Sequence, residues 1–126
     1  MRQSDRIALQ KMIAYCDDVA DLRAQFGDSF ECFTGNKAYQ YAAGMCIVQI
    51  GELVSRLSDE AKAEAPDIPW RLIRGMRNVY AHDYDQTKPA TIWQTLTEDI
   101  PRLKAQLERL VAHSTYVNDT DEEAIP

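Results

Sequence analysis

Hydrophobic residues follow a helical spacing along most of the chain. Apolar side chains recur every three or four residues from Ile7 to Val19, and again from Ile92 to Leu110, which is the spacing of one buried helical face. No segment alternates polar and apolar residues as a strand does, no internal repeat is evident, and no heptad lasts long enough for a free coiled coil. The pattern therefore predicts an all-α protein.

Capping residues place the first two long helices. Ser4 is a suitable N-cap and Gly27 a suitable terminator for a helix over roughly residues 5–25. Asn36 is expected to cap a second helix that runs to about residue 57. Short capped turns are expected between these helices, after Asp28 or Ser29, and again after residue 57.

Prolines mark the second half of the chain. Pro69 suits the first position of a third helix over about residues 70–81. The last long helix contains Pro101, which removes the hydrogen bond to Thr97, so we expect a kink there. Four long helices with short connectors predict an up-and-down four-helix bundle.

The second helix is unusually apolar. Between residues 41 and 54 the only strongly polar side chains are Gln49 and Glu52, so most faces of this helix should be buried, either in the bundle or in a subunit interface. Gly44 and Gly51 lie seven residues apart on nearly the same side, which would permit close contact with another helix.

Composition fits one soluble domain. The 126 residues are 45% hydrophobic and 27% charged, with a net charge of -6, which argues against broad, nonspecific binding to nucleic acid. Three well-separated cysteines, Cys16, Cys32 and Cys46, suggest reduced thiols. There is no signal peptide or membrane anchor at the start, so we expect a cytoplasmic protein. We expect a domain over residues 1–113 and a disordered acidic tail over residues 114–126.

A cationic stretch stands out against this acidic background. Residues 71–77 carry Arg71, Arg74 and Arg77 and no acidic residue, which suggests a site for an anion. Glu52, on the apolar second helix, would need a partner for its charge, and these arginines are the natural candidates. The alternative is that Glu52 reaches solvent at the edge of its helix.

Arg77 and His82 could cleave RNA without a metal. A histidine can exchange a proton with the 2′-hydroxyl or the leaving oxygen near neutral pH, and an arginine can hold the phosphate oxygens. On an intact helix, however, five residues separate these two side chains by roughly 140°. Either the helix loosens before His82, or the pair converges with that of a second subunit. Asn78 lies four residues before His82 and could orient the imidazole.

Purely structural interpretations compete with this one. His82 could simply cap a helix end, the arginines could be solvated, and the tyrosines could be packing residues. We expect Trp70 and Trp93 to lie in the core, and His113 to have no role beyond ending the last helix. His82 with the nearby aspartates is too loose a set to define a metal site.

Residues 77–84, Arg-Asn-Val-Tyr-Ala-His-Asp-Tyr, carry an R-x4-H-x-Y signature. With Ile-Gly-Glu at 50–52, Leu-Ser at 57–58, Ile-Pro-Trp at 68–70, Ile-Arg-Gly-Met at 73–76 and Trp93, the chain resembles the HepT-like toxins of the HEPN ribonuclease superfamily over about residues 5–112.

The resemblance implies a homodimeric HEPN bundle in which Arg77 and His82 of both subunits line one cleft, with Arg74, Asn78 and Glu52 in support. It implies a metal-independent endoribonuclease without a cofactor, acting on an RNA such as tRNA or mRNA as the toxin of a type II toxin–antitoxin pair. The antitoxin would be an MNT-type nucleotidyltransferase that inactivates the toxin by transferring AMP to Tyr84.

The sequence is also compatible with two other functions. The chain could be a noncatalytic helical subunit that binds nucleotide or substrate for a two-component nucleotidyltransferase, with the arginines holding a triphosphate. It could also be a plain helical interaction protein, with the apolar second helix as its contact surface.

Overall fold

The structure, a computed structural model, describes residues 1–114. This part of the chain is helical, without strands. The helices, in order, are α1 (Gln3–Phe26), α2 (Phe30–Thr34), α3 (Lys37–Val54), α4 (Asp59–Ala63), α5 (Trp70–His82), the 3-10 turn η1 (Tyr84–Gln86), α6 (Pro89–Gln94), the π-helical turn η2 (Thr95–Asp99) and α7 (Ile100–His113).

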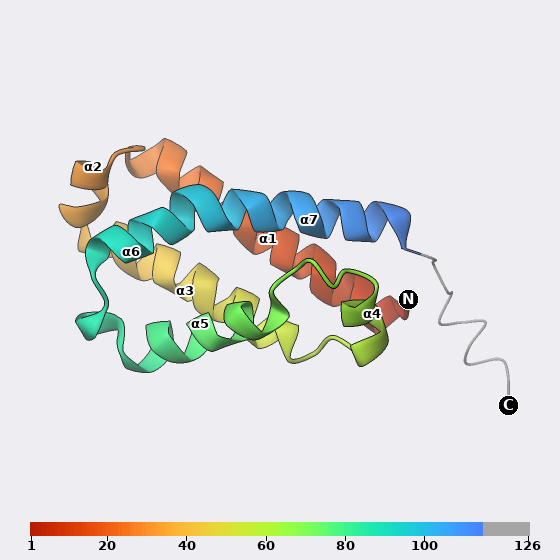
Figure 1. The fold of residues 1–126 in the computed structure, drawn as a ribbon. Coiled ribbons are helices and arrows are strands. Elements are labelled where there is room, and N and C mark those ends of the chain that lie inside the picture. The colour runs from red at the N-terminus through yellow and green to blue at the C-terminus, as the bar shows by residue number, and fades with distance from the viewer. Residues whose placement is uncertain (115–126) are drawn as a thin grey trace, which may run out of the picture.

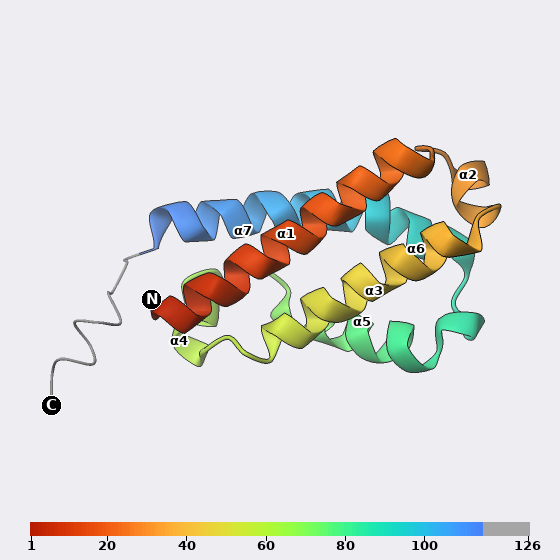
Figure 2. The same cartoon turned by 180° about the vertical axis from the view of Figure 1, so that it is seen from behind.

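Four antiparallel rods make the bundle, and α6, η2 and α7 follow one another as the fourth rod (Figures 1 and 2). Helix α3 contacts both α1 and α5, and α1 also contacts α7. The chain alternates direction from each long rod to the next, so the predicted up-and-down bundle is confirmed.

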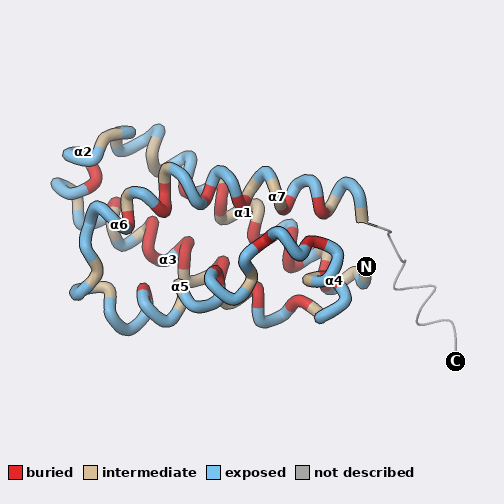
Figure 3. Tube along the Cα trace, in the orientation of Figure 1, coloured by how far each residue is buried: buried red, intermediate tan, exposed pale blue. Residues whose placement is uncertain are grey.

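The core lies where α1, α3 and α7 face one another. Figure 3 shows buried positions along these three helices, whereas α5 is mostly exposed. In α5 only Ile73 and Tyr80 are fully buried. The largest wholly buried apolar side chains are Tyr39, Phe33, Leu9, Met12, Ile47, Ile50, Leu96, Ile100 and Leu107. The helix that carries the arginines is thus a surface helix that packs mainly against α3.

The start of α1 differs from the prediction, whereas its end agrees. Arg2 is the N-cap residue and Ser4 lies inside the first turn, exposed, so Ser4 is not the cap. Gly27 ends the helix with a φ of 112°, a conformation that side chains disfavour. A Cβ atom at Gly27 would also lie only 2.4 Å from the sulfur of Cys32. A glycine is therefore required at this turn on both grounds.

Side-chain caps set the starts of three further helices. Ser29, Asn36 and Ser58 precede α2, α3 and α4, and each accepts a hydrogen bond at 3.1 Å from the backbone N–H three residues later. Asp28, the alternative cap of α2, instead pairs with Arg23 through two hydrogen bonds of 2.8 and 3.2 Å. The capped turns predicted from sequence are confirmed.

Helix α3 is shorter and more open than predicted. It ends at Val54 rather than near residue 57. The sides that meet α1 and α5 are buried, but Tyr41 and Met45 are 63% and 57% exposed. The prediction that most faces of this helix are buried is therefore only partly right. Most of its apolar side chains pack within its own bundle.

The fourth rod contains a π-helical turn immediately before the helix that holds Pro101, where the sequence predicted a kink. Helix α6 begins at Pro89, and η2 separates it from α7 just before Pro101. Because Pro101 has no N–H, the regular bonding of this turn cannot be completed. The hydroxyl of Thr97, in the same turn, donates to the carbonyl of Trp93, at 2.9 Å.

A buried carboxylate joins α1 to α4. Asp5, only 2% exposed, accepts hydrogen bonds from the N–H of Ser58 at 2.8 Å and from its hydroxyl at 2.7 Å. The same serine hydroxyl caps α4. This bond ties the start of the connector between α3 and α5 to α1, a contact that the hydrophobic pattern does not predict.

Both tryptophans pack against the core, as predicted. The ring N–H of Trp70 donates to two backbone carbonyls near α4. Within residues 1–114, no helix is long and apolar enough to cross a membrane. Ser114 is the C-cap of α7, and the remainder of the predicted acidic tail, with Asp119, Asp121, Glu122 and Glu123, lies outside the described residues.

Candidate active site

The seam between α3 and α5 positions the candidate residues. The two helices run antiparallel (Figure 1), so that Gly51 lies opposite Arg77 and Gly44 lies opposite Tyr84. A Cβ atom at Gly51 would lie 2.5 Å from the Cβ of Arg77, and one at Gly44 would lie 3.2 Å from the ring of Tyr84. The close contact predicted from the spacing of the glycines is confirmed.

Arg77 is held by two partners. Its Nε donates a short hydrogen bond to Oε1 of Glu52, and its Nη1 donates to Oδ1 of Asn78 at 3.1 Å. A guanidinium has five N–H donors, so three remain for a ligand. The pairing of Glu52 with this arginine stretch, one of two possibilities from the sequence, is confirmed.

This ion pair orients Arg77 more than it stabilises the fold. The side chains of Arg77 and Glu52 are 36% and 41% exposed, and a pair that solvent reaches is worth only ~0–1 kcal/mol. What it provides is a fixed direction for the guanidinium plane. A planar fork in a fixed orientation is well suited to bind two oxygens of one phosphate.

His82 lies on a different face of the same helix. Helix α5 continues without interruption to His82, so five residues place its side chain roughly 140° from Arg77. The alternative in which the helix loosens before His82 is therefore wrong. His82 is exposed, and in residues 1–114 its ring makes no hydrogen bond. A single subunit does not bring this pair together.

Asn78 and Arg74 differ in their surroundings. Asn78 bonds to Arg77, and not to His82 as the four-residue spacing suggested. Arg71 and Arg74 are exposed, and neither forms a hydrogen bond or ion pair within the described part of the chain. Their guanidinium groups are therefore available to an anion that approaches α5 from solvent.

Tyr84 is partly enclosed. Its hydroxyl donates to the backbone carbonyl of Gln40 at 3.1 Å, and its ring lies 6.3 Å from that of Tyr41 and 6.2 Å from that of Tyr80. Burial raises the pKa of the Tyr84 phenol, with smaller contributions from the neighbouring tyrosines and Asp85. The Tyr84 hydroxyl therefore already has a hydrogen-bond partner within the bundle.

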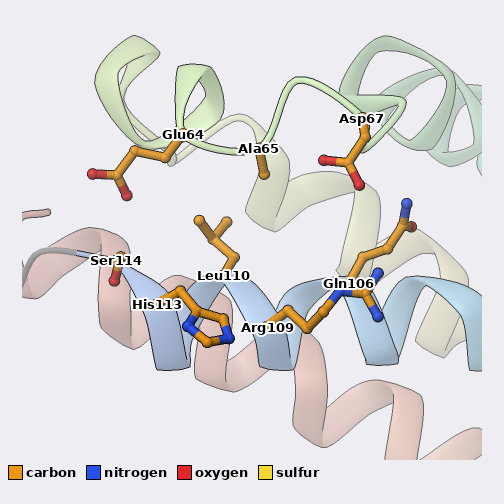
Figure 4. A pocket seen from close by; sticks show the side chains of 8 residues that line it. All are labelled: Glu64, Ala65, Asp67, Gln106, Arg109, Leu110, His113 and Ser114. Carbon is orange, nitrogen blue, oxygen red and sulfur yellow. The ribbon is translucent and has the colours of Figure 1, made fainter.

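A hollow lined by charged side chains lies where α7 ends and α5 begins. It has a volume of about 360 Å³ and lies between α7 and the segment after α4 (Figure 4). Arg109 and His113 line it together with Glu64 and Asp67. The two carboxylates oppose the binding of an anion, so this hollow does not compete with the α3–α5 seam as a phosphate site.

Metal-ligand residues do not cluster in the described structure. Within residues 1–114, no three His, Cys, Asp or Glu side chains are grouped closely enough to hold a metal ion. The seam and the exposed faces of α5 together present an oriented guanidinium, an exposed imidazole and two further cations.

Comparison with known proteins gives a consistent set of relatives. Residues 12–110 match the family model described as Ribonuclease HepT-like. A protein of Methanocaldococcus jannaschii named as an RNase is 30% identical over 103 residues, which cover 82% of this chain and 87% of the relative. A Thermococcus cleftensis protein named as a ribonuclease HepT is 36% identical over 81 residues, covering 64% of this chain and 74% of the relative. No solved structure gives a significant match.

Proposed function

The chain belongs to the HepT-like ribonuclease family, and from this premise we propose that it is a metal-independent endoribonuclease toxin that uses Arg77 and His82. The observation that carries the proposal is the Arg77 fork, which Glu52 and Asn78 orient while three of its N–H donors stay free. Reduced thiols and an RNA substrate fit a cytoplasmic enzyme.

The proposed reaction divides the work between these two side chains. The 2′-hydroxyl of the substrate loses a proton and attacks the adjacent phosphorus, and the 5′-oxygen leaves with a proton. The products are a 2′,3′-cyclic phosphate and a 5′-hydroxyl. Arg77 would stabilise the charge that grows on the nonbridging oxygens. His82 would accept the proton of the 2′-hydroxyl and give a proton to the leaving 5′-oxygen, so the imidazole ends as it began.

A homodimer would complete this site. Because α5 is intact, Arg77 and His82 of one subunit point in directions about 140° apart. A two-fold axis beside α5 would let one subunit's Arg77 act with the partner's His82 on the same phosphate. The apolar character of α3 is largely explained by its packing within its own bundle, so it gives less support for a dimer than the sequence suggested. The main support is the separation of Arg77 and His82 on different faces of α5. Sedimentation at micromolar concentration that finds only a monomer of about 14 kDa would contradict this.

The activity test compares variants of the purified protein on RNA in the presence of EDTA. Loss of a positioned proton-transfer group typically lowers the rate ~10²–10⁴-fold, so His82→Ala should lose that much activity. Arg77→Lys should also cleave RNA more slowly than the parent, because an ammonium group cannot replace the planar guanidinium fork. Arg102→Lys is the matched control, since Arg102 is an exposed arginine on α7 that also pairs with a carboxylate.

Folding must be checked alongside activity. Each variant should retain the far-UV circular dichroism of the parent. If folded His82→Ala cleaves RNA as fast as the parent, or if the chelated enzyme recovers only when a metal is added, the mechanism is wrong. Glu52→Gln should lower kcat without abolishing it, because Arg77 keeps its charge and loses only its orientation.

Regulation would act through Tyr84. An MNT-type nucleotidyltransferase would transfer AMP to the phenol oxygen, which attacks the α-phosphorus of ATP and displaces pyrophosphate. Because this hydroxyl donates to the carbonyl of Gln40, the side chain must first release that bond. The added phosphate would then compete with RNA for the cations of α5.

Mass spectrometry can test this part separately. After incubation with the transferase, ATP and Mg²⁺, the parent should gain AMP and Tyr84→Phe should not. Neutralisation of the toxin without any adduct on Tyr84 would count against the proposed regulation, while the ribonuclease proposal would stand.

A further inference from the structure

An aromatic hollow lies at the Tyr84 end of the α3–α5 seam. Its volume is about 480 Å³, within the ~300–1,000 Å³ range of clefts that hold small organic ligands. The side chains that line it are mostly apolar, and they include Tyr41, Met45, Val48, Tyr80, Ala81 and Tyr84. Tyr41 and Met45 are the most exposed of the large hydrophobic side chains on α3, although this helix is otherwise well packed.

The wall formed by Tyr84 is fixed. Its hydroxyl is bonded to the carbonyl of Gln40, and Gly44 lies behind its ring so closely that a Cβ atom there would be 3.2 Å away. The ring of Tyr41 is tilted by 50° against that of Tyr84, so the two rings do not stack on each other. The rings therefore stand at an angle beside an open space, with Tyr41 largely in solvent.

The hollow lies one helical turn along the same helix faces from Arg77 and Glu52. Ala81 follows Arg77 by four residues on α5, and Val48 precedes Glu52 by four residues on α3, so each pair shares a helix face. Gly51 faces Arg77 and Gly44 faces Tyr84. Seven helical residues separate the two levels by ~10 Å, at ~1.5 Å per residue.

The order of groups along the seam complements that of a nucleotide, in which a charged phosphate is followed by an aromatic base. The arginine end is cationic and retains free N–H donors, whereas the other end is mostly apolar and aromatic, with one carboxylate at its border. Asp85 lies on the border of the hollow, where its carboxylate would repel a phosphate but could accept a hydrogen bond from a base N–H. Unpaired bases of single-stranded RNA are commonly bound by stacking on aromatic side chains.

We propose that this hollow binds one nucleobase of a single-stranded RNA while Arg77 holds a neighbouring phosphate. The proposal rests on the proposed function for the identity of its ligand, and it adds a preference for unpaired RNA. Tyr41 is the stacking residue, and Tyr84 forms the fixed wall. The main competitor for the hollow is a second copy of the chain, which would cover Tyr41 in a dimer.

Binding of an uncleavable RNA tests the inference without requiring catalysis. The probe is a 2′-O-methyl oligoribonucleotide that carries 2-aminopurine, whose fluorescence falls when it stacks. Tyr41→Ala should raise Kd between about 5- and 150-fold, the range set by base–aromatic stacks, and should weaken the quenching. Tyr41→Phe, which keeps the ring, should bind like the parent. Leu72→Ala is the control, because Leu72 is 71% exposed on the other flank of α5 and borders a different groove.

An abasic scan identifies the stacked base. Removing one base at a time from the probe should reveal one position whose loss weakens binding as much as Tyr41→Ala does. With that abasic probe, Tyr41→Ala should have no further effect, because the two changes remove the same contact. Independent, multiplicative effects at every position would overturn the proposal.

Two further measurements separate the possible failures. If Tyr41→Ala binds and quenches as the parent does, or if it converts a dimer into monomers in sedimentation, the hollow is not a base site. If the parent shows Tyr41-dependent binding but never cleaves ordinary RNA, the base site stands and the ribonuclease proposal fails. If it cleaves RNA while Tyr41 has no influence on binding, the ribonuclease proposal stands and the base site fails.

Discussion

The contact between Gly51 and Arg77 makes a sharp test of the α3–α5 seam. In Gly51→Ala the new Cβ atom would lie 2.5 Å from the Cβ of Arg77 and 3.1 Å from the carbonyl oxygen of Ile73. Carbon atoms in good contact are ~3.5–4.0 Å apart. Neither of these neighbours can rotate away, because one is backbone and the other is attached directly to it. Helix α5 must therefore move by ~1 Å.

The expected size follows from two opposing effects. Overpacking of this kind costs ~1–3 kcal/mol, and the rigid neighbours favour the upper part of that range. Replacing a helical glycine by alanine returns ~0.5–1 kcal/mol. The free energy of unfolding should thus fall by ~1–2 kcal/mol. Gly75→Ala is the matched control on α5, because nothing lies within 4 Å of its added Cβ atom, so only the gain of ~0.5–1 kcal/mol remains.

Thermal and urea unfolding followed by circular dichroism measure the difference. The two variants should differ by ~1.5–3 kcal/mol, which for a domain of this size corresponds to about 5–15 °C in Tm. In Gly51→Ala, RNA cleavage should also fall, since Arg77 moves away from Glu52. If Gly51→Ala were as stable as Gly75→Ala, α3 and α5 could not be in close contact at Gly51 and Arg77.

Three further predictions concern the bundle. Asp5→Ala should lower the free energy of unfolding by ~1–3 kcal/mol in urea titrations, because it leaves buried donors of the α4 cap without an acceptor. Tyr39→Phe should leave Tm unchanged or raise it, because the buried Tyr39 hydroxyl has no hydrogen-bond partner in the described structure. Burial raises the pKa of the Cys16 thiol to about 12 and that of Cys46 to about 11, so both stay protonated at pH 8 and should react slowly with a disulfide reagent. Exposed Cys32 should give one rapid equivalent, and unfolding should release the other two.

Local chemistry explains what the sequence predicted well. The caps at Ser29, Asn36 and Ser58 and the terminator Gly27 act within three or four residues of their own position, so their spacing carries the signal. Pro101 likewise predicted a kink in the last helix, and the structure has the π-helical turn η2 just before it. The exception is the start of α1, where the sequence pointed to Ser4 but the N-cap is Arg2, which makes no side-chain capping bond that a sequence pattern could reveal.

Contacts between distant segments were harder to predict. In the sequence Asp5 looks like an ordinary acidic residue at a helix start. Its partner Ser58, whose hydroxyl lies 2.7 Å from the carboxylate, is distant in the chain, and hydrophobic periodicity does not predict such a contact. The bond from Tyr84 to Gln40 ends on a backbone carbonyl, which every residue type possesses. Glu52 was the exception, because a carboxylate in an apolar helix needs a cation, and the chain has one concentrated cationic stretch.

The site itself combines a rigid part and an open part. The α3–α5 seam fixes Arg77 through Glu52 and Asn78, whereas His82 stands free at the last residue of α5. Substrate phosphate can therefore be oriented before any proton moves, and the imidazole can approach it from outside the seam. An unbroken helix keeps His82 away from the Arg77 fork within one subunit, so the proposed mechanism requires the imidazole of a second molecule of the same chain. A mixture of inactive Arg77→Lys and His82→Ala subunits should then recover part of the activity, because one of the two composite sites in each mixed dimer holds both native residues. Mixtures that stay as inactive as their components would show that the fork and the imidazole do not act across a dimer.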